Sequence, residues 1–242
     1  MSSQPATSAM YRALLEGRIS TVRERMAQAA SRGGRKPSEV TLVAVTKVFP
    51  ADVVREAVAL GLNVFGENRV QEAREKIPLV GREGVSWHLV GHLQRNKVKY
   101  CFDLFDLIHS VDSLALAEEI DRRAEARDTE MEVLLEVNVG GEDVKHGVAP
   151  EDALMLAEAV SRLQRVKVKG LMTMPPWVAD PQENRGHFRA LREVSQEIAR
   201  AGIEGVEMKE LSMGMTADYE VAIEEGSTMV RIGTAIFGVR ES

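Results

Sequence analysis

Short apolar runs recur along most of the chain, and most of them are followed by a segment with helical spacing or with residues that favour a helix start. The runs are TLVAVT (41–46), NVFG (63–66), SWHLVG (86–91), DLIHSV (106–111), EVLLEVNV (132–139), VKVKGLM (166–172), MKELSM (208–213) and TMVRIG (228–233). The pattern predicts eight buried strands alternating with helices.

Apolar spacing and capping residues predict the helices. Leu15, Ile19, Val22 and Met26 recur at steps of four, three and four, so a helix should precede the first strand and end at RGGR (32–35). Asp112 can cap a helix that carries Leu116 and Ile120, and Pro150, Glu151 and Asp152 form a favourable first turn for the next one. A further helix is predicted from the apolar stripe of Phe188, Leu191, Val194 and Ile198. Thr216 can cap a last long helix, which should end at Gly226.

Eight strand and helix pairs in about 200 residues fit a closed (β/α)8 barrel of the TIM type better than an open doubly wound sheet. A seven-strand interpretation would keep the open sheet as an alternative. The length of 242 residues suits one large α/β domain. We therefore predict a disordered tail over residues 1–7, which are small, polar and proline-containing, and a single barrel domain over 8–242 with an extra amino-terminal helix.

Charge and composition exclude several classes of protein. The net charge is −6 with Lys and Arg spread among acids, so a nucleic-acid binder is not expected, although RNKVK (95–99) and RVKVK (165–169) leave a weak or transient RNA contact open. The single Cys101 cannot form an internal disulfide, and the five histidines lack the acidic or cysteine neighbours of a familiar zinc motif, so we expect no structural metal. No run reaches the roughly 18 apolar residues of a membrane span, and the start lacks a secretory signal, so we expect a cytoplasmic protein.

The unusual residues of this chain follow the predicted strands. In a β/α barrel the functional groups gather where the strands end, and phosphate groups often lie at the loops after strands seven and eight. The segments at these ends are Lys47, GEN (66–68), GH (91–92), NVGGE (138–142), MTMPP (172–176), SMGM (212–215) and GTAIFG (233–238). Polar and glycine-rich residues are therefore predicted to meet at one mouth of the barrel.

Lys47 ends the first strand, in VAVTKVF (43–49), and two interpretations are open. The lysine could simply pair with a carboxylate such as Glu67. Alternatively, its apolar neighbours could partly desolvate the amine, which would favour the neutral form and make it a nucleophile toward an aldehyde. The second interpretation predicts Schiff-base chemistry.

The segments LSMGM and RIGT carry the features of a phosphate site. Ser212 and Thr234 supply hydroxyl groups, and Gly214 and Gly233 allow backbone N–H groups to come close to an anion. The chain contains neither a GxxxxGK[ST] loop nor a GxGxxG fingerprint, so an ordinary nucleotide site is not expected.

A lysine that reacts with aldehydes opposite a phosphate site describes a protein that holds pyridoxal 5′-phosphate by both ends. Arg231 lies two residues before Gly233 on the same strand, so both positions point the same way, into the barrel or its mouth. The alternative for Arg231 is a structural ion pair with a barrel carboxylate.

Several motifs resemble the YggS/PROSC family, the pyridoxal phosphate homeostasis proteins. These motifs are LVAVTKVFP, FGENRVQE, WHLVGHLQRNKVK, HSVDS, GLMTMPP and LSMGMTADYEVAIEEGSTMVRIGTAIFG, and they extend from about Leu42 to Gly238. The resemblance implies the barrel fold of the alanine racemase barrel domain, the type III class of pyridoxal phosphate proteins.

The resemblance also assigns roles to single residues. It implies that Lys47 carries the cofactor as a Schiff base, that Ser212, Gly233 and Thr234 hold the phosphate, that Arg231 approaches the pyridine nitrogen, and that Asn68 lies beside the ring. Position 69 is Arg where family members often have an aromatic residue, so a contact made by that ring does not transfer to this chain.

The sequence favours a carrier or regulator of the cofactor over an enzyme. An arginine near the pyridine nitrogen disfavours ring protonation and weakens the electron sink. Efficient racemisation also needs a second acid–base group, which in the racemases resembled is a tyrosine from a further β-rich domain, and the sequence up to Ser242 leaves no room for one. Tyr11, Tyr100 and Tyr219 do not follow predicted strands.

Two alternatives to the carrier stay open. One is a weak racemase or lyase with His88 or His92 as second base, although HLVGH (88–92) is better explained by core or cofactor-packing histidines than by a metal pair. The other is a phosphosugar-binding barrel in which Lys47 forms no imine. We expect a monomer whose partners are the cofactor and, through transfer, pyridoxal phosphate-dependent apoenzymes.

Overall fold

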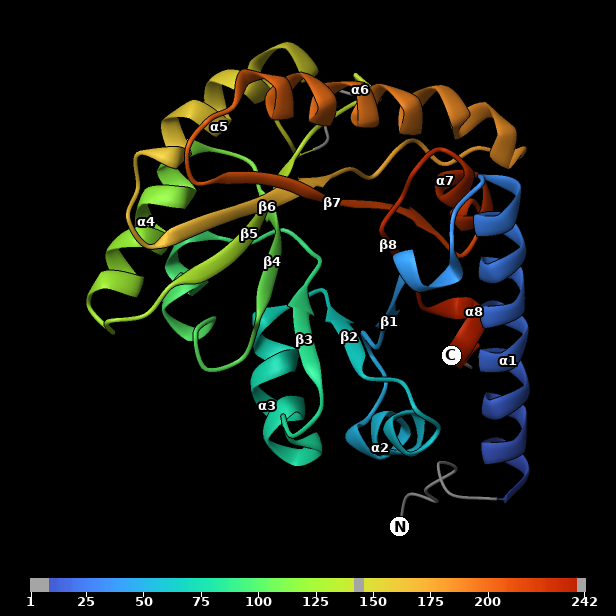
Figure 1. Cartoon of the computed structure of the whole chain (residues 1–242). Helices are drawn as coiled ribbons and strands as arrows, with labels where there is room; N and C mark the ends of the chain where they lie inside the picture. The colour runs from blue at the N-terminus through green and yellow to red at the C-terminus, as the bar shows by residue number, and fades with distance from the viewer. Residues whose placement is uncertain (1–8, 142–145, 239–242) are drawn as a thin grey trace.

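Eight parallel strands pair in chain order and the last pairs with the first, so the sheet closes into a barrel in this computed structural model (Figure 1). The strands are β1 (Thr41–Val45), β2 (Val64–Glu67), β3 (Ser86–Leu89), β4 (Leu107–Val111), β5 (Met131–Glu136), β6 (Val166–Met172), β7 (Val206–Met215) and β8 (Met229–Ile232). Every predicted apolar run overlaps one of these strands. The (β/α)8 barrel is therefore confirmed and the open sheet is wrong.

The structure describes residues 9–141 and 146–238, so the tail predicted over 1–7 lies outside the described residues. The α-helices are α1 (Ala9–Arg32), α2 (Ala51–Ala59), α3 (Val70–Val80), α4 (Leu114–Glu125), α5 (Ala153–Ser161), α6 (Arg185–Ala201), α7 (Tyr219–Glu224) and α8 (Thr234–Phe237). Short 3₁₀ helices lie at Pro37–Glu39, Arg95–Tyr100, Pro150–Asp152 and Pro181–Asn184. Within the described ranges, no helix is both long and apolar enough to cross a membrane.

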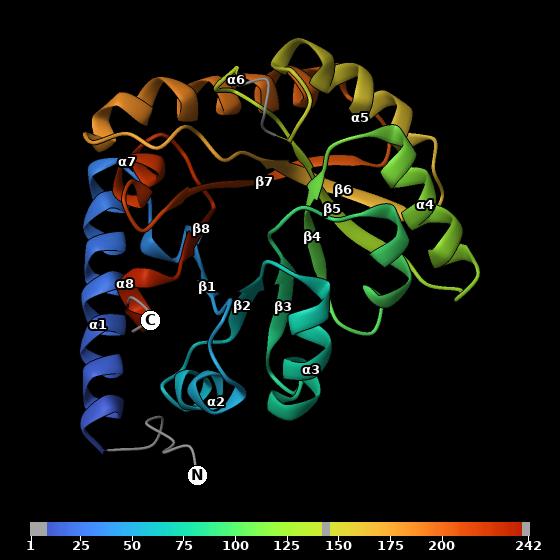
Figure 2. The same ribbon diagram turned by 180° about the vertical axis from the view of Figure 1, so that it is seen from behind.

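The extra amino-terminal helix α1 packs beside α7 and α8, as both views show (Figures 1 and 2). The predicted stripe of Leu15, Ile19, Val22 and Met26 is buried in this contact and against the neighbouring core. At the end of α1, Arg32 forms ion pairs with Glu220 at 2.9 Å and Glu224 at 2.6 Å. The first helix therefore covers the side of the barrel built by the last two.

Two predicted helix starts are wrong. The residue before α4 is Ser113, whose hydroxyl donates to the Asp112 carboxylate at 3.1 Å, so Asp112 does not cap the helix. The long helix predicted from Thr216 is the six-residue α7, preceded by Asp218. Because the Asp218 carboxylate accepts a hydrogen bond from the backbone N–H of Met215 at 2.7 Å, the chain turns tightly after β7 before the helix can begin.

The core has two parts. The larger one lies between the strands and the surrounding helices, as expected for a barrel whose outer face is covered. The smaller one fills the barrel interior and consists of Val43, Val45, Val90, Leu107, Leu134, Met172 and Met229. Polar side chains share this interior, among them the buried His88, His109, Ser212 and Arg231. The inside of the barrel is therefore partly polar, and these polar residues lie below the mouth.

Candidate functional site at the mouth of the barrel

The carboxyl ends of the strands place the predicted lysine and the predicted anion loop side by side. β1 and β8 pair in parallel with Ala44 opposite Ile232, so Lys47 and Gly233 follow the ends of neighbouring strands. A Cβ at Gly233 would lie 3.1 Å from the carbonyl oxygen of Val45, which shows how closely the two loops approach. The two predicted halves of the site therefore share one rim.

Lys47 lies in a two-residue turn after β1 and is exposed. Its neighbour Val48 has a φ of 63°, which is a true outlier for a β-branched residue and indicates local strain. The strained turn is held because the backbone N–H of Val48 donates to the Glu72 carboxylate at 3.2 Å. The expectation that apolar neighbours desolvate Lys47 is wrong, because the residue is exposed in the turn after β1.

A buried ion pair lies directly behind this turn. The Lys76 amine contacts the Glu67 carboxylate at 2.6 Å and the carbonyl oxygen of Thr46 at 2.6 Å, and the Thr46 hydroxyl donates to the same Glu67 oxygen at 2.6 Å. Glu67 therefore pairs with Lys76 and not with Lys47. Burial raises the pKa of Glu67, and the neighbouring Lys76 opposes this shift. Lys76 sits within the polar spacing of α3, so no sequence signal marked it.

Asn68 follows β2 and lies against the loop after β3. A Cβ at Gly91 would come within 2.3 Å of the Asn68 carbonyl oxygen, so only glycine allows the two loops to approach this closely. The side-chain oxygen of Asn68 is buried and has no hydrogen-bond partner among the described residues. Asn68 and His92 also line a cavity of about 430 Å³ together with neighbouring residues of both loops. An unpaired amide beside a cavity indicates a place for a ligand.

Arg231 and Ser212 meet inside the barrel. The guanidinium Nη1 donates to the Ser212 hydroxyl at 2.6 Å, and Nη2 donates to the carbonyl oxygen of Thr173, the residue after β6, at 2.8 Å. Burial lowers the pKa of Arg231 to about 10, and the nearby Glu136 and Asp218 oppose this shift. Arg231 is therefore still protonated at neutral pH, and its head group reaches from the interior to the mouth.

Ser212, predicted to hold a phosphate, has other partners in this structure. Its side chain is fully buried, and besides Arg231 it contacts Nδ1 of His109 at 2.9 Å. Gly214 has a φ of 91°, and a Cβ there would lie 2.5 Å from the Cβ of Ala222 on α7. Close packing of β7 against α7 is thus sufficient to explain this glycine.

Gly233 and Thr234 lie on the rim, directly after β8. Gly233 is half-buried, Thr234 is exposed, and together they begin α8. The backbone N–H of Ala235 donates to the Thr216 hydroxyl at 3.4 Å, and that of Ile236 donates to the Gly233 carbonyl at 3.0 Å, so both already have acceptors. Of the predicted phosphate residues, these two lie on the rim and Ser212 lies below it.

Glu136, the last residue of β5, was not predicted. It is 3% exposed, and its Oε2 has no hydrogen-bond partner among the described residues. Burial raises the pKa of Glu136 to about 7, the negative charge of Asp112 adds to the shift, and Arg231 opposes it. The sequence does contain a signal for this residue, because a glutamate near the end of the apolar run EVLLEVNV is an unusual residue for a buried strand.

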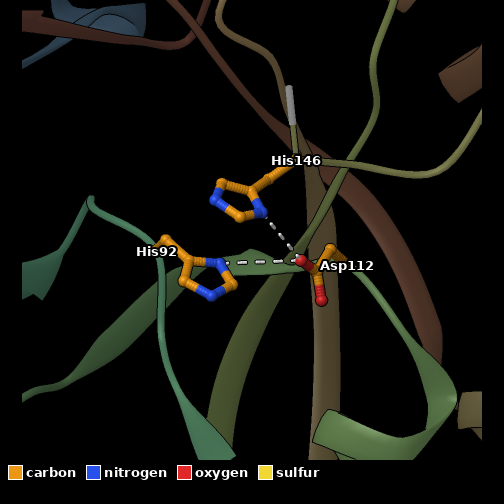
Figure 3. Close-up of side chains that lie close together, drawn as sticks. All are labelled: His92, Asp112 and His146. Atoms are coloured by element: carbon orange, nitrogen blue, oxygen red, sulfur yellow. Dashed lines mark ion pairs between the residues drawn. The ribbon is translucent and has the colours of Figure 1, made fainter. Parts of the chain in front are cut away.

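His92, Asp112 and His146 come from the ends of β3 and β4 and from the segment before α5, and they face one another at the rim (Figure 3). Nδ1 of His92 and Nδ1 of His146 lie 3.7 Å and 3.9 Å from the same Asp112 oxygen, and the two rings stack at 3.7 Å between centroids. Burial lowers the pKa of His92 and the neighbouring His146 lowers it further, whereas the negative charge of Asp112 raises it. Their ligand atoms lie within 4.8 Å of one another, so in the described part of the chain these are the donors that a cation would find.

The two histidines of HLVGH therefore separate. His88 is 6% exposed and points into the barrel, where its Nδ1 lies 3.0 Å from Nε2 of His109. His92 points to the rim. The prediction that His88 is a core histidine agrees with its burial, and the spacing of the pair does not bring both to one ligand.

The match with known proteins covers nearly the whole chain. Residues 19–241 match the family model described as alanine racemase, N-terminal domain. A relative from Aquifex aeolicus named pyridoxal phosphate homeostasis protein is 47% identical over 224 residues, which cover 93% of this chain and 97% of that protein. The chain belongs to the pyridoxal phosphate homeostasis protein family.

Solved structures agree with this family assignment. A structure described as an unknown protein from Bifidobacterium adolescentis has a TM-score of 0.92 and 37% identity, and the alignment covers 97% of this chain and 98% of that one. PipY of Synechococcus elongatus, solved with pyridoxal phosphate bound, has a TM-score of 0.80 and 36% identity, with 93% and 100% of the two chains covered. The resemblance seen in the sequence motifs is thereby confirmed.

Proposed function

We propose that this protein binds pyridoxal 5′-phosphate at the mouth of the barrel, through a Schiff base with Lys47, and serves to hold and deliver the cofactor within the cell. The observation that carries the proposal is the placement of Lys47 and Gly233 after neighbouring paired strands, β1 and β8. It is supported by PipY, which has 36% identity to this chain and was solved with the cofactor bound.

The residues at the mouth fit this cofactor. Lys47 is an exposed amine that can condense with an aldehyde. The unpaired buried oxygens of Asn68 and Glu136 would gain a polar partner when a ligand binds. We assign the phosphate to Gly233 and Thr234, and the ring to the neighbourhood of Asn68 and Arg231.

Ser212 and Gly214 take supporting roles in this proposal. The Ser212 hydroxyl is buried against Arg231, so it acts on the site by holding that guanidinium. Gly214 allows β7 to pack against α7, which places the loop after β7. The predicted set of site residues is thus kept, with two members acting behind the rim.

The side chains at the mouth favour storage of the cofactor over catalysis. Bound pyridoxal phosphate supplies an electrophilic carbon and an electron sink, and the sink depends on protonation of the ring nitrogen. A protonated Arg231 disfavours a second positive charge beside it. The three tyrosines lie in α1, at the end of the 3₁₀ helix Arg95–Tyr100, and in α7, which leaves no tyrosine on the loops that form the mouth in the described residues.

A weak racemase or lyase is the second candidate, and one observation favours it. His92 lies at the rim next to Asp112 and lines the same cavity as Asn68, so it is the histidine placed to act as a second base. His88 is not placed for this role, because its ring is bonded inside the barrel.

A spectroscopic titration tests the proposed function. Adding pyridoxal phosphate should give a Schiff-base absorption band, and borohydride should remove that band and leave a stable cofactor mass on Lys47. Lys47→Ala should lose the band but keep some phosphate-anchored binding, whereas Lys36→Ala, an exposed lysine just before β1, should behave as the unchanged protein. No band, or reduction that labels other lysines equally, contradicts the proposal.

Two further measurements separate holding from catalysis. The loaded protein should transfer its cofactor to an apoenzyme in the presence of a trap for free aldehyde. Solvent deuterium should enter the Cα position of amino acids no faster than with free cofactor. A Lys47-dependent rate far above that level would establish the enzyme instead.

A further inference from the structure

A continuous run of hydrogen bonds crosses the barrel from the mouth to the opposite end. Starting at the mouth, it joins Arg231 to Ser212 (2.6 Å), Ser212 to His109 (2.9 Å), His109 to His88 (3.0 Å), His88 to Ser86 (3.2 Å) and Ser86 to Asp106 (3.3 Å). Ser86 begins β3 and Asp106 precedes β4, so the run ends where the strands start. There it borders a second cavity, of about 290 Å³, which His88 also lines.

The two ends of this run fix its direction. A guanidinium can only donate, so the Ser212 hydroxyl accepts from Arg231 and gives its own hydrogen to Nδ1 of His109. At the other end a carboxylate can only accept, and Asp106 forms an ion pair with Arg82. Between these ends, each histidine must accept at Nδ1 and donate from Nε2.

We propose that these six side chains form one polarised chain in which every bond is donated in the direction from Arg231 to Asp106. His109 and His88 then act as positioning residues, because their tautomers hold the Ser212 hydroxyl in the orientation that accepts from Arg231. The guanidinium is fixed at two nitrogens, by Ser212 and by the Thr173 carbonyl, and so presents a constant face to the mouth.

The opposite direction is disfavoured at both ends. If His109 donated from Nδ1, the Ser212 oxygen would accept two hydrogen bonds and its own hydrogen would have no acceptor in a fully buried position. Ser86 would also have to turn its hydrogen from the Asp106 carboxylate to His88. Buried polar groups without partners are rare in folded proteins, so one arrangement of tautomers remains.

Neutral rings are a condition for the chain, since a protonated imidazole cannot accept. Burial lowers the pKa of His88 to about 4, with Asp106 opposing the shift. Burial likewise lowers the pKa of His109 well below its usual value, and His88 and Arg231 add to the effect. The charged groups that line the cavity at the far end are Asp106, Glu132, Lys169, Glu207, Lys209 and Glu210. Both histidines are therefore neutral at neutral pH.

The tautomers can be read directly in the protein without cofactor. Long-range ¹H–¹⁵N correlation spectra of protein labelled with ¹⁵N-histidine should show His88 and His109 as neutral rings with hydrogen on Nε2 from about pH 6 to about pH 8. Ser212→Ala should change the tautomer population of His109, whereas Ser195→Ala, a buried serine on α6, should not. An Nδ1–H tautomer at either ring, or titration of either ring in this range, overturns the proposal.

The positioning role rests on the proposed function and is tested with the cofactor bound. His109→Phe breaks the chain without touching the mouth, so Arg231 should lose its fixed orientation near the ring. With the cation no longer held there, the pH midpoint of the Schiff-base band should rise by about half a pH unit, and Ser195→Ala should leave it unchanged. A band with equal midpoints in both variants contradicts the positioning role. Failure of the unchanged protein to give any band contradicts the proposed function instead, and the histidine spectra then decide the chain alone.

Discussion

The buried pair of Lys76 and Glu67 behind the Lys47 turn gives the sharpest test of the energetics. Glu67 is fully buried, the Lys76 side chain is 8% exposed, and their charged atoms lie 2.6 Å apart. At an effective dielectric constant of about 20, this distance corresponds to an attraction of about 6 kcal/mol before the cost of desolvation. Removal of one partner from a buried pair typically costs about 3 to 5 kcal/mol, because the other charge is left without compensation. Lys76→Met should therefore lower the free energy of unfolding by about that amount.

The loss should also depend on pH. Without the lysine, burial and the charge of Glu72 raise the folded-state pKa of Glu67 further above the unfolded value, and the hydrogen bond from Thr46 opposes them. A carboxyl group with a raised folded pKa loses stability as the pH rises through that pKa, so the variant should be less destabilised at about pH 5 than at about pH 8.

Urea denaturation followed by circular dichroism at both pH values measures these effects. Arg12→Met is the matched control, because Arg12 and Glu56 form a pair of 3.0 Å whose side chains are 50% and 25% exposed, and such surface pairs contribute less than about 1 kcal/mol. The double variant Lys76→Met with Glu67→Gln should recover much of the loss. A Lys76→Met cost no larger than that of Arg12→Met, or a double variant no better than the single one, refutes the reasoning.

Other parts of the structure make predictions that need no cofactor. The pKa of Glu136 is about 7 in the folded state against a usual 4.5. The free energy of unfolding should therefore fall by about 3 kcal/mol as the pH rises from about 4.5 to about 7, and Glu136→Gln should make this pH dependence weaker in urea titrations. Gly214→Ala should lower the melting temperature by several degrees, since its Cβ would strike Ala222, whereas Gly17→Ala, with open space around it in α1, should raise it slightly. Cys101 is buried with a thiol pKa of about 12, so Ellman's reagent should react with it at the rate of unfolding, and rapid reaction of the native protein would contradict that burial.

The strands were predictable because strands buried on both faces leave continuous apolar runs in the sequence. The helix starts were less predictable. Thr216 and Asp218 are both suitable capping residues before α7, and the helix begins after Asp218, whose carboxylate accepts a hydrogen bond from the backbone N–H of Met215. Sequence spacing also placed Lys47 and Gly233 at the ends of the first and last strands, which the closed barrel then brought together.

Contacts between distant residues were beyond the sequence. Lys76 finds Glu67 because α3 packs back on the end of β2, and a polar position in a helix gives no sign of such a partner. Lys47 was expected to be desolvated by its sequence neighbours, but a turn begins after Thr46 and leaves it exposed. The hydrogen bond between His88 and His109 could not be predicted for the same reason, because the two side chains come from different strands and meet inside the barrel.

The pairing of β8 with β1 has a consequence for how the protein is made. The lysine turn is among the first parts of the barrel to leave the ribosome, and the strand that precedes Gly233 is the last strand of the barrel. Contacts between such distant segments form late, after the costly closure of a long loop. A nascent chain with seven strands can therefore present the amine but lacks Gly233 and Thr234, so cofactor retention would report that the barrel has closed.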